Sequence, residues 1–148
     1  MEFTMQHWTP EQQKAHRQEW IKALRSGQYK QGYRQLRSKI GYCCLGVACD
    51  VAIKSGAFPT LKWTEEIAGI GYEVVNEHGD KAFGLPPIEI QHYFGICNRA
   101  GLFEPSTPTD HINNLARMND DGGATFDDIA NLIEIEPPGL VRASPVSD

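Results

Sequence analysis

The chain has 148 residues and a formal net charge of −5, with 41% hydrophobic and 22% charged residues. This length and balance predict one soluble domain with a core of its own and exclude an intrinsically disordered protein. The net acidity argues against a nucleic-acid polymer as partner, and the apolar runs are too short to span a membrane.

The first helix is predicted from Pro10 to about Arg25. Thr9 is typical of an N-cap, and Gln12 completes a capping box with it. Ser26-Gly27 predicts the end, because glycine tolerates the left-handed conformation that follows many helices. The residues expected to face inward are Ala15, Trp20, Ile21 and Leu24.

A turn and a short strand near Tyr33–Ser38 are predicted next, followed by a helix over Cys43–Ser55 that stops at Gly56. Its inner face is expected to carry Cys44, Val47, Ala48, Val51 and Ala52. Gly46 allows another backbone or a ligand to approach this helix closely, because it has no Cβ. Tight packing against another helix is the favoured explanation.

A second strand pair is predicted at Leu61–Thr64 and Tyr72–Asn76, with a turn at Glu77–Asp80. The prolines at 86 and 87 then favour a short helix over Pro87–Phe94, which Gly95 ends. A loop is expected over Leu102–Thr109.

A helix is predicted over Asp110–Met118, and a last one begins at Thr125 and ends near Glu134–Ile135. Carboxylates in the first turn of the last helix suit the helix dipole. Several short helices with a small antiparallel sheet indicate a single domain of the α+β class.

We expect residues 1–8 to form a flexible arm, residues 9–136 a single globular domain, and residues 137–148 a disordered tail. The sequence does not begin with a signal-peptide pattern. We therefore expect a cytoplasmic location, in which the four cysteines are reduced.

A basic stretch without any acidic residue runs from Trp20 to Cys49. Residues 14–62 hold ten basic and two acidic residues, whereas residues 63–148 hold four basic and fifteen acidic ones. Either the two halves neutralise each other on packing, or the basic half binds an anion, or the two halves meet head to tail between subunits. Arginine binds phosphate through paired donors, and tyrosine rings stack on bases. The candidate ligand-binding residues are Tyr29, Tyr33, Arg34, Arg37, Lys39, Tyr42 and Cys43.

The cysteines at 43, 44 and 49 lack the paired spacing of structural zinc sites, so no metal or other cofactor is expected. Cys43 near a helix start, with Arg37 and Lys39 close by, is a candidate nucleophile. Its base would be a histidine, and the sequence does not select one among His78, His92 and His111. No P-loop, dinucleotide-binding glycine pattern or hydrolase motif is present, and no catalytic residue is assigned.

Residues 20–32 (WIKALRSGQYKQG) and 42–50 (YCCLGVACD) resemble a family of small proteins of bacteriophage and bacterial genomes. Residues 85–86, 115–120 and 126–130 fit the same resemblance, and residues 57–84 have no counterpart in it. The Cys-Cys-Leu-Gly-Val string is the mark of this family, which implies no catalytic assignment. Small phage proteins include anti-defence proteins that sequester nucleotide-derived immune signals, an analogy of class only.

The leading expectation is a non-catalytic homo-oligomer that binds and sequesters a small anionic, nucleotide-derived ligand, as a phage anti-defence sponge of a host immune signal. One alternative is an enzyme that degrades such a signal through a cysteine or a carboxylate–histidine pair. Another is an interaction protein that inhibits a host factor through the acidic C-terminal half. Neither a membrane nor a nucleic-acid polymer is expected as a partner.

Overall fold

The computed structural model describes residues 8–65, 71–103 and 114–141. Within these ranges, five helices and a four-stranded antiparallel sheet form one compact α+β domain, as predicted. The elements in chain order are α1 (Pro10–Arg25), β1 (Arg37–Ser38), α2 (Cys44–Lys54), β2 (Lys62–Glu65), β3 (Gly71–Val75), β4 (Lys81–Ala82), α3 (Ile88–Phe94), α4 (Leu115–Asp120) and α5 (Phe126–Ile135).

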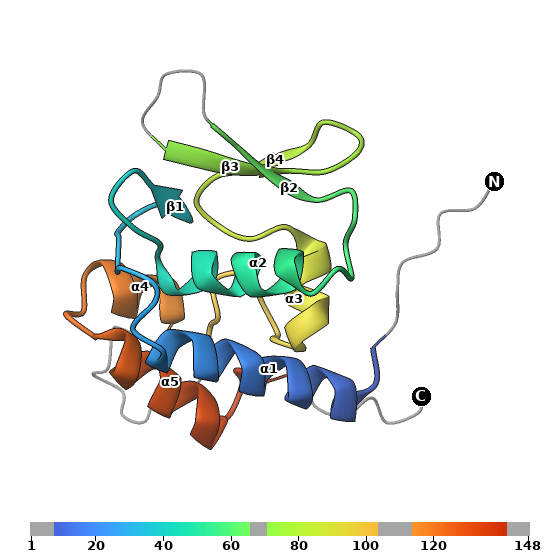
Figure 1. Ribbon diagram of the computed structural model, residues 1–148. Helices are drawn as coiled ribbons and strands as arrows, with labels where there is room; N and C mark the ends of the chain where they lie inside the picture. The colour runs from blue at the N-terminus through green and yellow to red at the C-terminus, as the bar shows by residue number, and fades with distance from the viewer. Residues whose placement is uncertain (1–7, 66–70, 104–113, 142–148) are drawn as a thin grey trace.

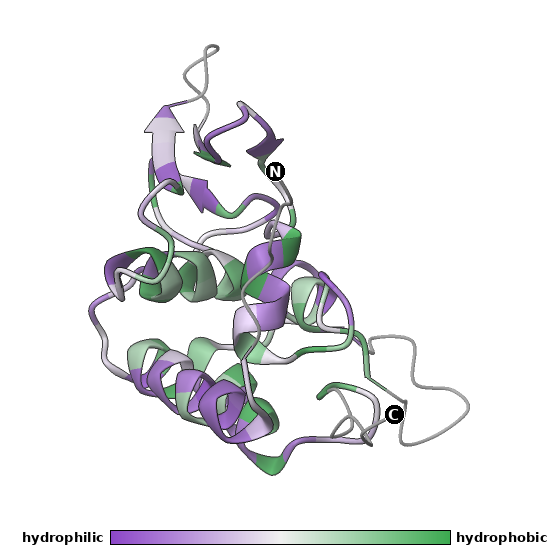
Figure 2. Ribbon diagram, turned by 90° about the vertical axis from the view of Figure 1, so that its right-hand side faces the viewer, coloured by the Kyte–Doolittle hydropathy of each residue, from purple (hydrophilic) through white to green (hydrophobic). Residues whose placement is uncertain are grey.

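Helix α2 lies in the middle of the domain, with the sheet on one side and the neighbouring helices α1 and α5 on the other (Figure 1). Its residues 44–50 are all buried. Figure 2 shows hydrophobic residues gathered in the helices beneath the sheet, whereas the strands are more hydrophilic. Within the described ranges, no helix has both the length and the apolar character needed to cross a bilayer.

Strand β3 is the centre of the sheet. β2 pairs with β3 along one edge, with Trp63 opposite Val74, and this confirms the predicted strand pair. β1 and β4 pair with opposite ends of the other edge, where Arg37 faces Tyr72 and Ala82 faces Val74. Directly opposed residues point to the same face of a sheet. Because Val74 is buried, this face is the one turned toward α2.

Local signals define the helix ends as predicted. The Thr9 hydroxyl accepts a hydrogen bond from the Gln12 backbone N–H, and the Gln12 side chain accepts one from the Thr9 N–H. α5 begins with the same reciprocal pair between Thr125 and Asp128. α3 ends at Gly95, whose φ of 69° is in the left-handed region that favours glycine.

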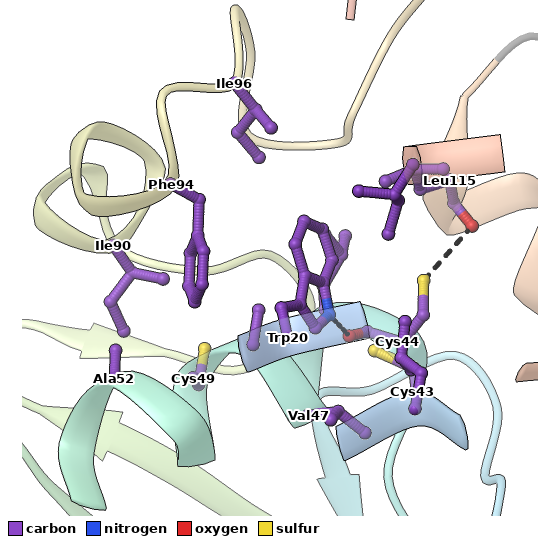
Figure 3. Close-up of a cluster of buried hydrophobic side chains, with 14 of the residues drawn as sticks. Trp20, Cys43, Cys44, Val47, Cys49, Ala52, Ile90, Phe94, Ile96 and Leu115 are labelled. Atoms are coloured by element: carbon purple, nitrogen blue, oxygen red, sulfur yellow. Dashed lines mark hydrogen bonds between the residues drawn. The ribbon is translucent and has the colours of Figure 1, made fainter. Parts of the chain in front are cut away.

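The core is centred on Trp20, which is completely buried between α1, α2 and α3 (Figure 3). The Trp20 indole N–H donates to the Cys44 carbonyl at 3.0 Å, so this ring is both packed and satisfied. Cys44 in turn places its Sγ 3.5 Å from the Leu115 carbonyl. The string 43–49 therefore supplies small hydrophobic groups at the point where three helices meet.

Asn119 is a buried polar residue that forms four hydrogen bonds near the N-terminus of α2. Its Oδ1 accepts hydrogen bonds from the Gln31 side chain and the Cys44 backbone N–H, at 2.9 and 3.1 Å. Its Nδ2 donates to the Gly32 carbonyl and to Asp120 Oδ1, at 2.8 and 3.0 Å. This one residue of α4 thus fixes the loop that leads from α1 to β1, and with it the position of the basic stretch.

The close approach at Gly46 is confirmed, but the favoured explanation for it was wrong. The neighbour is not another helix; it is the Leu36 carbonyl in the loop just before β1. A Cβ on Gly46 would lie only 1.7 Å from that oxygen. The same carbonyl accepts the Cys43 N–H at 3.1 Å, so the loop is fastened to the first turn of α2.

Two local expectations on α1 and β1 were wrong. Ala15 is exposed, because the buried stripe of α1 runs through Arg17, Trp20, Ile21 and Leu24 instead. The strand expected over 33–38 is limited to Arg37–Ser38. Arg34 has a left-handed φ of 69°, which interrupts the extended backbone.

The helix predicted over 110–118 begins later and ends later, at Leu115–Asp120. Its start is fixed by Asn114, whose side chain accepts the Arg117 N–H at 2.8 Å. Residues 110–113, and most of the predicted loop 102–109, lie outside the described residues.

Both expected domain boundaries need correction within the described residues. Trp8 packs edge-on against His16 and Tyr93, with ring centroids 4.9 and 5.1 Å apart, so it does not belong to a free arm. Leu140 is completely buried, and its carbonyl accepts the Cys97 N–H at 2.9 Å, so residues 137–141 are packed on the domain. The rest of the predicted arm and tail, 1–7 and 142–148, lies outside the described residues.

Candidate functional site

Three of the seven candidate residues come together beside α2. They are Tyr29, Arg37 and Tyr42, and they lie in contact with Trp63 and Tyr72 of the sheet. We call these five residues the aromatic flank. All five side chains are partly exposed, so the flank lies where the layer between the sheet and α2 opens to solvent. The other four candidates are located elsewhere.

The strand register brings the sheet residues of the flank together. Arg37 of β1 is paired with Tyr72 of β3, and Trp63 of β2 is paired with Val74. Because Tyr72 and Val74 are two residues apart, they share the face of the sheet turned toward α2. Tyr42 precedes α2, and it joins the group because the Tyr42 N–H and carbonyl bind the backbone of residues 30 and 32.

The Arg37 guanidinium lies against three rings. Its central carbon is 4.1 Å from the ring centroid of Tyr72, 5.1 Å from that of Tyr42 and 5.4 Å from that of Trp63. These distances are within the range of cation–π contacts. Among the described residues, no carboxylate forms an ion pair with Arg37 and no acceptor takes a hydrogen bond from its guanidinium.

Asp50 of α2 forms hydrogen bonds with two aromatic side chains of the flank, Tyr29 and Trp63. It is 5% exposed, and its carboxylate accepts hydrogen bonds from the Tyr29 hydroxyl at 2.5 Å and the Trp63 indole N–H at 3.0 Å. Lys54, one turn later, forms an ion pair with the same carboxylate at 3.0 Å. A buried carboxylate needs such partners, and here they fix two rings in place.

Two tyrosines of the flank, Tyr29 and Tyr42, are held in their neutral form. Burial raises the pKa of Tyr29, and the hydrogen bond to Asp50 raises it further. Burial also raises the pKa of Tyr42, whose ring meets that of Tyr29 edge-on with centroids 5.0 Å apart. Tyr29 and Tyr42 therefore offer ring faces and hydroxyl groups rather than a phenolate.

A groove of about 470 Å³ between α1 and α2 begins at Tyr29. Lys22 of α1 and Lys54 of α2 line it, together with the C-cap serines of both helices, Ser26 and Ser55. Tyr29 thus belongs both to the flank and to a hollow that carries Glu19, Lys22 and Lys54, the last of which is paired with Asp50. This is the space next to the flank into which a small ligand can extend.

Arg34 and Lys39 are compensated by the protein's own carboxylates, so the expectation of an unpaired basic stretch was wrong for these two. The Arg34 guanidinium is 3.0 Å from Asp121, and its backbone N–H donates to Asp120 at 2.8 Å. Lys39 forms an exposed ion pair with Glu65 at 3.3 Å. Tyr33 is half exposed and is not part of the flank.

Cys43 is turned into the core rather than toward the flank surface. It is 4% exposed, and its Sγ caps α2 by accepting the Gly46 N–H at 3.3 Å. Burial raises the pKa of its thiol to about 11, and it also raises the pKa values of Cys44 and Cys49. A buried thiol with a raised pKa is a poor nucleophile at neutral pH. The described residues contain no cluster of three potential metal ligands.

The sequence reasoning missed Asp50, Trp63 and Tyr72. Asp50 had a visible signal, since it is the first acidic residue after the basic stretch and follows a helical run of apolar residues. Trp63 and Tyr72 stood in predicted strands, but nothing local showed which face of the sheet they would occupy. Their place follows from the register of β2 and β1 on β3.

The fold and the flank together define a small α+β domain with a partly open aromatic and cationic surface. The chain belongs to the family described as Domain of unknown function (DUF8296), whose model matches residues 12–137. No curated protein and no solved structure matched the sequence. The family match includes the whole flank and all nine helices and strands except the first two residues of α1.

Proposed function

We propose that this protein binds a small anionic ligand that carries a flat ring system, of the nucleotide-derived kind, and holds it without cleaving it. The observation that carries the proposal is the Arg37 guanidinium, which lies within 4.1–5.4 Å of three ring centroids and has no carboxylate partner among the described residues. The biological role we propose is sequestration of a nucleotide-derived immune signal, as expected from the resemblance to phage proteins.

Arg37 suits the anionic part of such a ligand. The N–H groups of a guanidinium lie in one plane and bind phosphate oxygens in pairs. The surrounding rings lower the exposure of the charge to water, which strengthens a charge-assisted hydrogen bond. Arg34 has no comparable freedom, because Asp121 already neutralises it.

The rings suit the aromatic part. Stacking of a base on an aromatic side chain stabilises binding without requiring a particular base sequence. Asp50 fixes Tyr29 and Trp63 through direct hydrogen bonds, so little side-chain entropy is lost when a ligand binds. The groove beside Tyr29 gives room for a further part of the ligand, where Lys22 would be its cationic contact.

The burial and raised pKa of the Cys43 thiol favour binding without reaction over an enzyme that uses a cysteine nucleophile. Cys43 is buried as a helix cap, and its pKa of about 11 leaves almost no thiolate at neutral pH. Asp50 has its carboxylate occupied by Tyr29, Trp63 and Lys54, so it is a structural anchor of the flank.

Isothermal titration of the full chain against adenosine monophosphate, ADP-ribose, cyclic ADP-ribose and a cyclic dinucleotide tests the proposal. We expect at least one to bind, and adenosine and inorganic phosphate to bind more weakly because each offers only half of the contacts. Chromatography after incubation should return the bound nucleotide intact. Recovery of a cleaved product would support the enzyme alternative instead.

The matched variants are Arg37→Gln and Arg34→Gln. Arg37→Gln is expected to weaken binding by about tenfold to a hundredfold, the loss of a charge-assisted hydrogen bond worth about 1.5–3 kcal/mol. Arg34→Gln should leave the affinity unchanged, because Arg34 is outside the flank. Equal losses in both variants, or no heat with any nucleotide of the panel, would refute the site.

A further inference from the structure

A second hollow, of about 370 Å³, lies between the β3–β4 hairpin and the first turn of α3. None of the residues of the aromatic flank lines it, and neither does Asp50. It therefore requires an explanation of its own. Its lining residues fall largely within residues 57–84, a segment that the family match includes.

The floor of this hollow is apolar. Leu61, Val74 and Ala82 line it, and they are 5%, 1% and 6% exposed. Val74 and Ala82 are directly paired across β3 and β4, so they present one continuous surface on the inner face of the sheet. Ile88, at the start of α3, forms an apolar wall and is 43% exposed. A large aliphatic side chain with this much exposed surface beside a hollow is suited to contact with an apolar ligand group.

The rim of the hollow carries charges of both signs. Lys81 of β4 reaches the rim from the outer face of the sheet, where it is paired with Val75. Glu77 and Asp80 of the hairpin turn and Glu89 of α3 supply carboxylates, and Arg99 supplies a cation. None of these five charged residues forms an ion pair with another residue of the described segments. Arg99 is held in place, because its Nε donates to the Pro86 carbonyl at 2.7 Å. Unpaired charges of both signs thus surround one apolar floor.

We propose that this hollow binds a small zwitterion with an apolar body, the chemistry of a free hydrophobic amino acid or a short hydrophobic peptide. The ammonium group would face Glu77 and Glu89, the carboxylate would face Arg99, and the aliphatic side chains would cover the floor. Charge complementarity of both signs selects such a ligand over a simple amine or a simple acid. A nucleotide is disfavoured here, because three carboxylates without an ion pair, those of Glu77, Asp80 and Glu89, would repel its phosphates.

The probe is the dipeptide L-leucyl-L-leucine, titrated into the full chain and followed by calorimetry and by the methyl resonances of the protein. We expect binding in the millimolar range or tighter, with the methyl signals of Leu61, Val74, Ala82 and Ile88 shifting together. The same dipeptide with an acetylated N-terminus and an amidated C-terminus should bind at least tenfold more weakly. Isoamylamine and 4-methylpentanoate, which carry one charge each, should also bind at least tenfold more weakly.

Matched variants locate the charged contacts. Glu89→Gln and Arg99→Gln should each weaken the binding of the dipeptide at least tenfold. Glu73→Gln and Lys62→Gln alter charges on the outer face of the same sheet, and they should leave the affinity unchanged. The methyl shifts of the wild-type protein report the site even where a variant is poorly folded.

Three results would overturn the proposal. The first is the absence of binding up to about 10 mM, a concentration at which only negligible affinity would escape detection. The second is equal binding of the blocked dipeptide or of the simple amine, which would remove the role of paired charges. The third is a set of shifted methyl groups elsewhere in the domain. Arg37→Gln should not affect this site, so its outcome is separate from the nucleotide experiment.

Discussion

At the scale of single residues, the three cysteines of residues 43–49 have structural roles that differ from one to the next. Cys43 caps α2 through its sulfur, Cys44 binds Trp20 through its carbonyl, and Cys49 is completely buried in the core (Figure 3). A run of small apolar side chains fits between closely packed helices without leaving voids. The cysteines of residues 43–49 therefore serve the packing of α2 rather than a reactive centre.

The titration of Cys43 gives a prediction on alkaline stability. Its folded pKa is about 11, raised from the ordinary 9.0, so the protonated thiol is favoured by folding. The resulting stability is fully present below pH 9 and is lost as the pH rises from 9 through 11, because the unfolded chain then releases the proton more easily. Cys43→Ser keeps an N-cap oxygen but does not titrate in this window.

The measurement is the free energy of unfolding in urea at pH 8 and at pH 10.5. The wild-type protein should lose more stability between these two pH values than Cys43→Ser does, by a difference on the order of 1–2 kcal/mol. Both proteins should still lose some stability between the two pH values, because the pKa values of Cys44, Cys49 and Tyr29 are raised too. Identical losses would show that Cys43 is not held in its neutral form.

At the scale of the elements, the contact between α2 and the loop before β1 determines where Arg37 lies. Gly46 lets the Leu36 carbonyl reach the first turn of α2, and Arg37 follows immediately in the chain. Any shift of this loop would move Arg37 away from the rings of Tyr42 and Tyr72. The packing of the string and the geometry of the candidate site are therefore linked.

Gly46→Ala separates helix propensity from this close approach. Propensity alone predicts a gain of about 1 kcal/mol, because alanine is the better helix former. The new Cβ would instead lie 1.7 Å from the Leu36 carbonyl oxygen, so the loop must move. We expect a net loss of about 3 kcal/mol in the free energy of unfolding, together with weaker nucleotide binding.

Gly84→Ala is the control, since a Cβ there meets nothing within 4 Å. It should change the stability by no more than a few tenths of a kcal/mol, as expected for a surface position. If Gly46→Ala were as stable as Gly84→Ala in urea unfolding, the loop would have to be free to withdraw from α2.

At the scale of the whole molecule, the basic and acidic halves of the chain neutralise each other at several points. Arg25 pairs with Glu134, Arg34 with Asp121, and the buried Arg17 with Glu136. Exposed pairs of this kind add little stability, but they reduce the positive field of the basic stretch. Arg37 differs because it is turned toward the rings of the sheet and not toward the acidic helices.

The segment after α5 closes the domain. Leu140 is completely buried, and Val141 forms an antiparallel bridge with Ile96. Leu140→Ala should therefore reduce the free energy of unfolding by about 2–5 kcal/mol, the range for truncation of a buried leucine. Leu102→Ala is the matched control, because Leu102 is 44% exposed and should cost far less. Urea unfolding distinguishes the two, and equal losses would place Leu140 at the surface.

Most helix boundaries could be predicted from the sequence, because the signals that set them act within four residues. Thr9 with Gln12, Thr125, and Gly95 each mark an end that the structure confirms. The start of α4 was missed because Asn114 is only one of several polar residues in that segment, and the strand at 33–38 was overestimated because Arg34 is held by a carboxylate from α4.

The candidate site was predicted only in part. Tyr29, Arg37 and Tyr42 were chosen from composition alone, and so were Arg34 and Lys39, which the fold pairs with acids. Residue type cannot separate these two groups, because every arginine and lysine of the stretch has the same local chemistry. Only their distance from carboxylates and rings elsewhere in the chain makes them different.

By itself, the sequence determined the α+β class, the ends of α1, α2, α3 and α5, and the pairing of β2 with β3, since capping, glycine and alternation act through neighbouring residues. The tertiary structure alone decided which cations are neutralised and which one faces the rings. That choice depends on the strand register and on contacts between residues as far apart as Arg34 and Asp121, where no local rule applies.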